Sequence, residues 1–185
     1  LSARDLMRAV SRPDLPSPDW LKLAHDAAYV EQVLACRVPP KIEREIGFPI
    51  VERVSRRAQL AGAGTVLAAR LALEHGIACN TAGGSHHARH AHGAGFCTFN
   101  DVGVAASVLL ATGEAARILV VDCDVHQGDG TADIFRDEPR VFTALDAFER
   151  EGDGGLRRHF ILIAALCRWR AGTPRAADDA LDARW

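Results

Sequence analysis

The chain has 185 residues, of which 48% are hydrophobic and 25% are charged, and its formal net charge is −2. This composition is enough for one hydrophobic core and excludes a disordered or fibrous protein. A chain with so little net charge has no basic field that would attract nucleic acid or an anionic membrane, so we expect neither as a partner.

The cysteines indicate the compartment, and the first residues indicate whether the chain is a fragment. The five cysteines are widely spaced, odd in number and contain no CxxC pair: Cys36, Cys79, Cys97, Cys123 and Cys167. We therefore expect no disulfide framework and no cysteine-based zinc site, and we expect a reducing, cytoplasmic compartment. The chain starts with Leu1 rather than Met, without an apolar signal sequence, which favours a fragment: one partial domain over residues 1–185.

In chain order, the first fifty residues are broken by prolines and contain one candidate helix, near Trp20 to Cys36. Apolar residues then recur at helical spacing from Val54 to His75, and Gly76 is suited to a left-handed helix end. Ile77 to Ala82 has the composition of a short buried strand, which Gly83 and Gly84 would end.

The second half alternates helices and strands. The elements expected are a helix from Val102 to about Ala111 capped by Asn100 or Asp101, a strand over Ile118 to Val125, a short helix starting at "TADIF", and a short strand over Arg140 to Thr143. This alternation is typical of βαβ units and predicts an α/β fold with a parallel sheet.

The stretch "LVVDCDVHQGDGT" (Leu119 to Thr131) places polar groups at the end of the apolar strand. Successive strand residues point to opposite faces, so Asp122, Asp124 and His126 would share one face. Two carboxylates ~6.7 Å apart repel each other by roughly 2.5 kcal/mol at an effective dielectric of about 20, which a cation would offset. One carboxylate oxygen and one imidazole nitrogen suit Zn²⁺. The alternative is that Asp122 and Asp129 cap turns and that His126 is an ordinary hydrogen-bonded histidine.

A second group of polar residues lies in "GGSHHARHAHGAGFCTFND" (Gly83 to Asp101). The two glycines allow the backbone to leave a regular strand, so both His86 and His87 could enter one cavity. One could act as a general base on a metal-bound water and the other as an electrostatic partner or general acid, provided that a carboxylate orients each. Asp122 and Asp129 are the candidates for this role.

Other residues of this stretch are weaker candidates. His90 and His92 are interpreted as solvated loop histidines, and Cys97 as a small buried hydrophobic residue. Phe96, after Gly95, could form an aromatic wall beside the site, although a single Phe is more often part of a core.

These motifs together resemble the zinc-dependent histone deacetylase family, in its bacterial and class IV-like branch. The resemblance runs from about Ala24 to Thr143 (24–143) and rests on "IEREIGFP", "GGSHHA", "GFCTFNDVGVAA", "DCDVHQGDGTADIF" and "RVFT". It implies an arginase-deacetylase α/β fold, a three-layer sandwich with a central parallel sheet that is incomplete at the C-terminus. It also implies hydrolysis of the N-acetyl amide of an acetyl-lysine or a small acetylated amine such as an acetylpolyamine.

The resemblance implies roles for individual residues. They are Asp124 and His126 as zinc ligands, His86 and His87 as the tandem catalytic histidines, Asp122 and Asp129 as their carboxylate partners, Gly95 and Phe96 as walls of the substrate channel, and Asp122, Asp124 and His126 as a region that binds a monovalent cation such as K⁺.

Two family features have no match. A second Asp ligand and an oxyanion-binding Tyr should follow the matched region, but the only tyrosine is Tyr29, and the tail over residues 144–185 does not resemble the family. We interpret the tail as the product of a disturbed reading frame. Two alternatives remain: a truncated, inactive deacetylase-like fragment, and an arginase-like enzyme with two manganese ions, whose DxHxD spacing differs from that of Asp124, His126 and Asp129.

Overall fold

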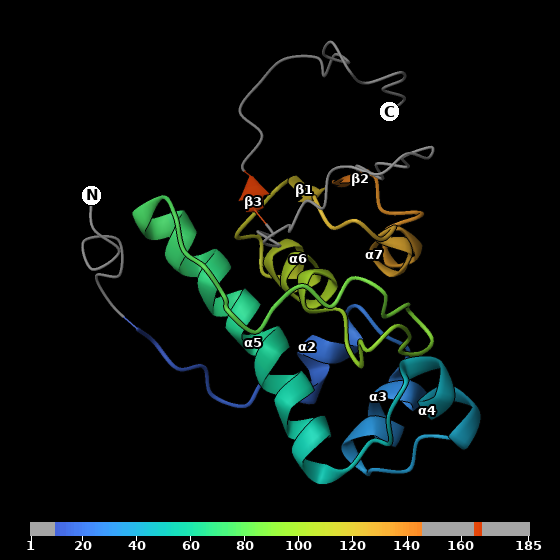
Figure 1. Ribbon diagram of the computed structural model, residues 1–185. Coiled ribbons are helices and arrows are strands. Elements are labelled where there is room, and N and C mark those ends of the chain that lie inside the picture. The colour runs from blue at the N-terminus through green and yellow to red at the C-terminus, as the bar shows by residue number, and fades with distance from the viewer. Residues whose placement is uncertain (1–9, 146–164, 168–185) are drawn as a thin grey trace, which may run out of the picture.

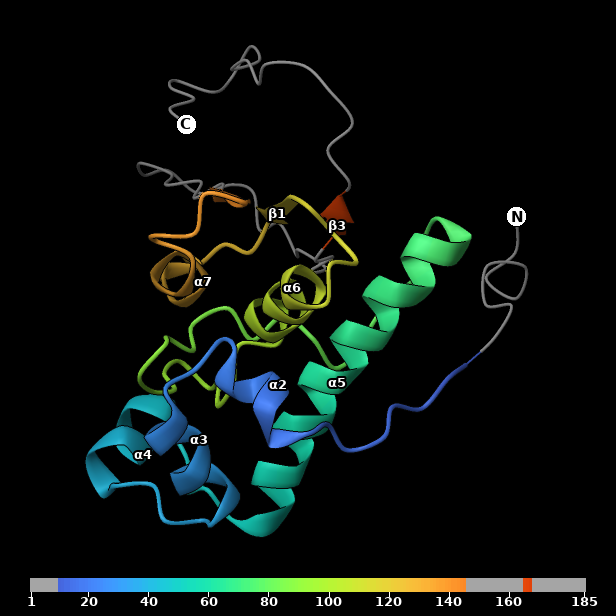
Figure 2. The same cartoon turned by 180° about the vertical axis from the view of Figure 1, so that it is seen from behind.

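A computed structural model describes residues 10–145 and 165–167 of the chain. Its elements, in chain order, are α2 (Pro18–Lys22), α3 (Ala27–Leu34), α4 (Pro40–Ile46), α5 (Glu52–His75), α6 (Asp101–Ala111), β1 (Ile118–Asp122), α7 (Asp129–Ile134), β2 (Val141–Leu145) and β3 (Ala165–Cys167). Figures 1 and 2 show α6 between the strands and the short N-terminal helices, with the long helix α5 running alongside.

The single helix expected near Trp20 to Cys36 is wrong, because the structure has two helices there, α2 and α3. Asp26 separates them. Its carboxylate accepts hydrogen bonds from the backbone amides of Ala28 and Tyr29, at 2.9 and 3.1 Å. A carboxylate that bonds to the amides following it starts a new helix rather than continuing the previous one.

The two longer helices agree with the expectation. Helix α5 ends at Gly76, which has a φ of 94° and donates its N–H to the carbonyl of Ala72. Helix α6 is capped by Asn100, whose side-chain oxygen accepts the N–H of Gly103 at 2.8 Å. Val66 of α5 and Val104 of α6 lie in one buried cluster, so the two helices pack directly against each other.

The strand expected over Ile77 to Ala82 is wrong, because the structure has an irregular loop there and Ile77 is 81% exposed. Asn80 ties this loop to α5. Its amide nitrogen donates to the carbonyl of Ala61 and to Thr65, and its oxygen accepts the N–H of Ala82. These side-chain bonds replace the strand pairing that the apolar composition suggested.

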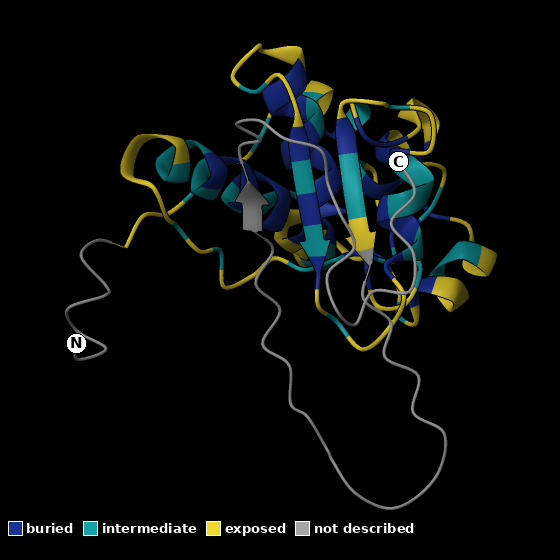
Figure 3. Cartoon of the chain, turned by 90° about the horizontal axis from the view of Figure 1, so that it is seen from above, coloured by how far each residue is buried: buried dark blue, intermediate teal, exposed yellow. Residues whose placement is uncertain are grey.

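The described strands form one sheet in the order β2-β1-β3. The pairing of β1 with β2 is parallel, with Ile118 opposite Val141 and Asp122 opposite Leu145, while β3 pairs antiparallel on the other edge of β1. Figure 3 shows β1 and β2 side by side. The chain passes from β1 through α7 to β2, which is the strand–helix–strand connection that the alternation of elements predicts.

Helix α6 covers one face of this sheet and thereby determines which end residue of β1 is buried. Ile118 and Val120 of β1 pack with Val102 and Leu109 of α6 in a second buried cluster. Alternate residues of β1 are buried, so Asp122 follows Ile118 and Val120 onto the covered side. Strand β1 therefore places the carboxylate of Asp122 at the carboxyl end of the strand, on the side that α6 covers.

Of the unmatched tail expected over residues 144–185, residues 146–164 and 168–185 lie outside the described residues. None of the helices that the structure describes combines the length and apolar character needed to cross a membrane.

Candidate functional site

Strand β1 ends at Asp122, so the expected strand to Val125 and the shared strand face of Asp124 and His126 are wrong. The carboxylate of Asp124 accepts the backbone N–H of His126 at 2.7 Å, which bends the chain into a turn. The turn nevertheless brings the two side chains together, because Nδ1 of His126 lies 2.9 Å from the same oxygen, Oδ1 of Asp124.

His86 forms the buried part of the site with Asp122. The Nδ1 atom of His86 lies 2.6 Å from Oδ2 of Asp122, and both side chains are less than one tenth exposed. The other ring nitrogen, Nε2, lies 3.8 Å from Oδ1 of Asp124. His86 thus links the carboxylate at the end of β1 to the carboxylate in the following turn.

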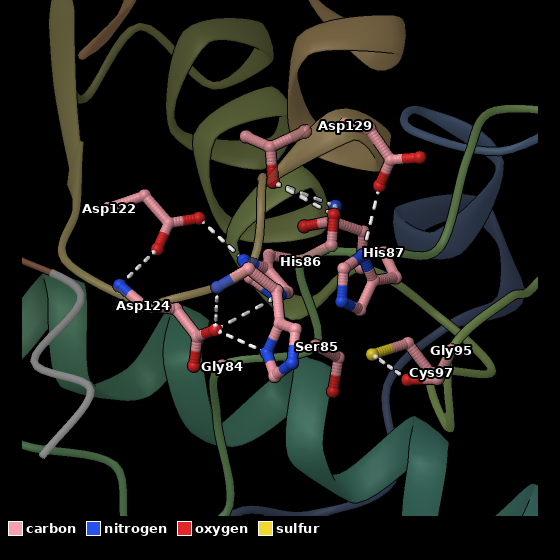
Figure 4. A network of polar contacts seen from close by, with 12 residues as sticks. Gly84, Ser85, His86, His87, Gly95, Cys97, Asp122, Asp124 and Asp129 are labelled. Carbon is pink, nitrogen blue, oxygen red and sulfur yellow. Dashed lines mark hydrogen bonds and ion pairs between the residues drawn. The ribbon is translucent and has the colours of Figure 1, made fainter. Parts of the chain in front are cut away.

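His87 forms a second pair with Asp129, the first residue of α7. Its Nδ1 lies 2.9 Å from Oδ1 of Asp129. Its ring centroid is 4.1 Å from that of His86 and 5.9 Å from that of His126. Figure 4 shows the two histidines side by side with the carboxylates around them. Both rings use Nδ1 for a carboxylate. This leaves Nε2 of His87 for a substrate or a water, whereas Nε2 of His86 faces Oδ1 of Asp124.

The backbone before the histidines is held by Asp101, the first residue of α6. Its carboxylate is 1% exposed. It accepts the N–H groups of Gly84 and Ser85 and the hydroxyl of Thr65, the last at 2.6 Å. Gly83 lies so close that an added Cβ would come 2.6 Å from Oδ2 of Asp101. The glycines therefore allow the close approach through which α6 positions the histidine loop.

We expect Asp101→Asn to lower the free energy of unfolding by about 1–3 kcal/mol, because the amide group would turn a donor toward other buried donors. Urea unfolding measures this loss. The control is Asp137→Asn at an exposed position, which should change stability by less than ~0.5 kcal/mol. Equal stability of the Asp101 variant and the unmodified protein would show that Asp101 does not anchor the loop.

The pKa directions follow from these contacts. Burial alone would lower the pKa of His86, but the hydrogen bond to Asp122 and the nearby carboxylates outweigh it and raise that pKa. Burial would raise the pKa of Asp124, yet the hydrogen bonds from the His126 backbone and ring lower it. Burial would also raise the pKa of Asp129, but the hydrogen bond from His87 and the charge of Arg89 outweigh it and lower that pKa. The two carboxylates are thus held ionised.

The donors suit zinc in kind but are incomplete in number. Ligands that each lie ~2.1 Å from a tetrahedral zinc are ~3.4 Å apart, and Oδ1 of Asp124 and Nδ1 of His126 are 2.9 Å apart. A catalytic zinc site uses three protein ligands. Within residues 10–145 and 165–167, no group of three or more His, Cys, Asp or Glu side chains is arranged to hold a metal ion. The described residues therefore supply two donors of the kind that zinc binds, and these two are hydrogen-bonded to each other at a separation shorter than that of two zinc ligands.

Gly95 lies against the ring of His87, whereas the ring of Phe96 lies near Gly47 and Phe48. An added Cβ at Gly95 would come 2.7 Å from Cδ2 of His87, so the backbone packs directly on the ring. Phe96 is 74% exposed and has a φ of 64°. The N–H groups of both residues donate to the last turn of α4, at the carbonyls of Glu45 and Ile46. The exposed Phe96 ring therefore lies against the C-terminal end of α4, one residue after the glycine that packs on His87.

The weaker candidates have structural partners. Nδ1 of His90 bonds to the carbonyl of Ala24, and Nδ1 of His92 lies 3.4 Å from Glu45. Cys97 is buried, and burial raises the pKa of its thiol.

Tyr29 is also engaged, because its hydroxyl donates to the buried carbonyl of Thr98 at 2.8 Å. Tyr29 therefore supports the core and does not point a donor at the histidines.

Two residues around the site were missed by the sequence reasoning. Asp101 was considered only as a helix cap, and Arg89, whose guanidinium contacts Asp129, was not considered at all. The position of Arg89, two residues after His87 in a loop rich in histidine, is the only signal in the sequence that could have drawn attention to it.

An α/β fold with two histidine–carboxylate pairs at the carboxyl end of a strand defines a protein of the arginase-deacetylase fold. The solved structure titled "Crystal Structure of HDA15 HD domain" matches with a TM-score of 0.59 and 26% identity, over 72% of this chain and 38% of that chain. A family model described as histone deacetylase domain matches residues 2–153. The chain belongs to the histone deacetylase family.

Two of three similar curated proteins are named as histone deacetylases. An uncharacterized protein of Picosynechococcus sp. is 52% identical over 134 residues, which are 72% of this chain and 45% of that protein. Histone deacetylase 8 of Xenopus laevis is 31% identical over 74% of this chain and 45% of its own length. Histone deacetylase 2 of Arabidopsis thaliana is 39% identical over 60% of this chain and 26% of its own length. The chain spans less than half the length of each of these relatives.

Proposed function

We propose that this chain carries part of the catalytic site of a zinc-dependent deacetylase, which hydrolyses the N-acetyl amide of an acetyl-lysine or a small acetylated amine to acetate and the free amine. Membership in a family of deacetylases supports an acetylated substrate in general. The observation that carries the proposal is the double pairing of His86 with Asp122 and His87 with Asp129 beside Asp124.

The two pairs suit general acid–base catalysis at an amide. Each carboxylate orients its imidazole through Nδ1, so that Nε2 is the ring atom that takes or gives a proton. His87, the more exposed of the two, is proposed to take the proton from the attacking water. The deeper His86, which bonds to Asp122, is proposed to stabilise the developing charge and to protonate the leaving amine.

Asp124 and His126 are proposed to hold the zinc ion, with a third ligand from outside the described residues. When bound, zinc would polarise the acetyl carbonyl and lower the pKa of a bound water toward ~7. Gly95 and Phe96 are proposed to line the entry of the acyl chain, since Gly95 packs on the His87 ring and the exposed Phe96 follows it in the chain. The region of Asp122, Asp124 and His126 is proposed to bind K⁺ as well.

An inactive, binding-only form of this domain is a second candidate. It is favoured by the two ligands, rather than three, that the described residues provide, and by the engagement of Tyr29 in the core. An arginase-like activity is less well supported, because two of the relatives described above are named as histone deacetylases.

A fluorogenic acetyl-lysine assay with added zinc separates active from inactive forms. The comparison is between the full chain and its His86→Ala/His87→Ala variant, because general acid–base groups contribute about 10²–10⁴-fold to the rate. A difference of this order supports the deacetylase proposal. Equal background rates in both proteins, with the unmodified chain folded, would contradict catalysis by this chain and favour the inactive form.

A further inference from the structure

Asp129 divides its two carboxylate oxygens between a histidine and an arginine. Oδ1 accepts from Nδ1 of His87, and Oδ2 accepts from the guanidinium of Arg89. We propose that Arg89 is a positioning residue, which holds the Asp129 carboxylate in the orientation that bonds His87 and so determines the tautomer and the ring position of His87. Nothing in the proposed deacetylase chemistry itself requires an arginine at this place.

Two hydrogen bonds, one of them from a buried histidine, hold the backbone of Arg89 in place, so its side chain extends from a fixed position. Its N–H donates to the carbonyl of His92 at 2.9 Å, and its carbonyl lies 2.8 Å from Nδ1 of His25. The His25 ring is 1% exposed, and its Nε2 accepts the backbone N–H of Asn100 at 3.0 Å. Because Nε2 is an acceptor, Nδ1 must carry the proton and donate to Arg89. The N-terminal part of the chain thus anchors Arg89.

The carboxylates around His86 and His87 distinguish Arg89 from the other Lys and Arg side chains that the structure describes. Three carboxylates, those of Asp122, Asp124 and Asp129, surround the two rings. Among the residues that the structure describes, Arg89 is the only Lys or Arg side chain in an ion pair with any of the three. Without Arg89, the Asp129 carboxylate would lose its only charged Lys or Arg partner among the described residues, and it would be less restrained about its side-chain bonds.

An exposed ion pair is often only a surface feature, and α7 provides one for comparison. Arg136 pairs with Asp133 at 2.7 Å and is 70% exposed, whereas Arg89 is 40% exposed. The partner of Arg136 contacts no histidine ring, since its other oxygen accepts only the backbone N–H of His90. Arg136→Gln is therefore a matched control: it removes the same kind of pair without touching His87.

The catalytic meaning of this inference rests on the proposed function, but its test requires neither metal nor substrate. Nuclear magnetic resonance of ¹⁵N-labelled histidines distinguishes the two ring nitrogens of His86 and His87 in the full chain. The measurement is made at an alkaline pH at which the ring signals no longer change with pH, because the raised pKa of His86 extends its titration above the ordinary histidine range. Signals are assigned with His86→Asn and His87→Asn variants.

We expect both histidines of the unmodified chain to show a single tautomer with the proton on Nδ1. In Arg89→Gln, His87 should lose this pattern and show both tautomers, while His86 keeps its own, because Asp122 still holds it. Arg136→Gln should leave both unchanged. An unchanged His87 in Arg89→Gln, or an equal change in His86, would overturn the proposal. If Arg89→Gln does not fold, Arg89→Met replaces it with the same readings, since a methionine side chain has no donor for Oδ2 of Asp129.

Discussion

The free energy of unfolding should fall by about 3 kcal/mol when the pH drops from about 6.5 to about 4, because His25 is buried and neutral. Burial lowers the pKa of His25 from 6.5 to about 4, although hydrogen bonds to backbone groups oppose this. Between these pH values the unfolded chain binds a proton that the folded chain does not, so stability decreases as the pH falls. Protonation would also break the bond from Asn100 N–H to Nε2.

Urea unfolding at a series of pH values measures this dependence, with His25→Gln as the control. Glutamine retains an acceptor but does not titrate, so the slope between about pH 6.5 and 4.5 should flatten by about 1.4 kcal/mol per pH unit. His86 does not interfere, because its raised pKa adds stability that is fully present below about 6.5 and is lost at higher pH. Parallel pH profiles for the two proteins would contradict a neutral, buried His25.

The second large effect is expected for Gly130→Ala in α7, which should lower the free energy of unfolding by about 3 kcal/mol. An added Cβ would overlap the carbonyl oxygen of Ala88 and would come 2.6 Å from the carbonyl oxygen of His86. These are backbone atoms of the histidine loop, so neither can rotate away. Helix α7 would have to shift, and Asp129 would move away from His87. Urea unfolding measures the loss.

Gly62→Ala in α5 is the matched control, because a Cβ there would lie 3.7 Å from Val104, an ordinary contact. That variant should be unchanged or more stable by up to ~1 kcal/mol, since alanine is the better helix former. A Gly130 variant as stable as the unmodified protein would mean that α7 does not pack on the histidine loop as described.

The partners of the histidines were predictable because they follow from simple chemistry. Two adjacent histidines need orienting carboxylates, and Asp122 and Asp129 were the nearest candidates at the end of a predicted strand. The long helix α5 and the cap at Asn100 were predictable for a similar reason, since helical spacing and capping residues are local signals.

The errors share one physical cause, which is that short polar side chains can replace backbone pairing. Asn80 binds helix α5 and its own loop, so Ile77 to Ala82 forms no strand. Asp26 and Asp124 bond to amides two residues later, which divides a helix in one case and ends a strand in the other. Apolar composition does not reveal such bonds. The contact between Arg89 and Asp129 was also hidden, because it depends on α7 packing against the loop.

The direct test of the account is zinc binding by the full chain, measured by titration calorimetry and elemental analysis. We expect zinc to bind at a single site, with an affinity that falls by at least ~100-fold in Asp124→Asn and in His126→Asn. The control is His92→Asn, at a histidine beside Glu45, which should have the zinc affinity of the unmodified protein. Failure of the chain to bind zinc, or equal affinity in all four proteins, would contradict the assignment of Asp124 and His126 as the metal ligands.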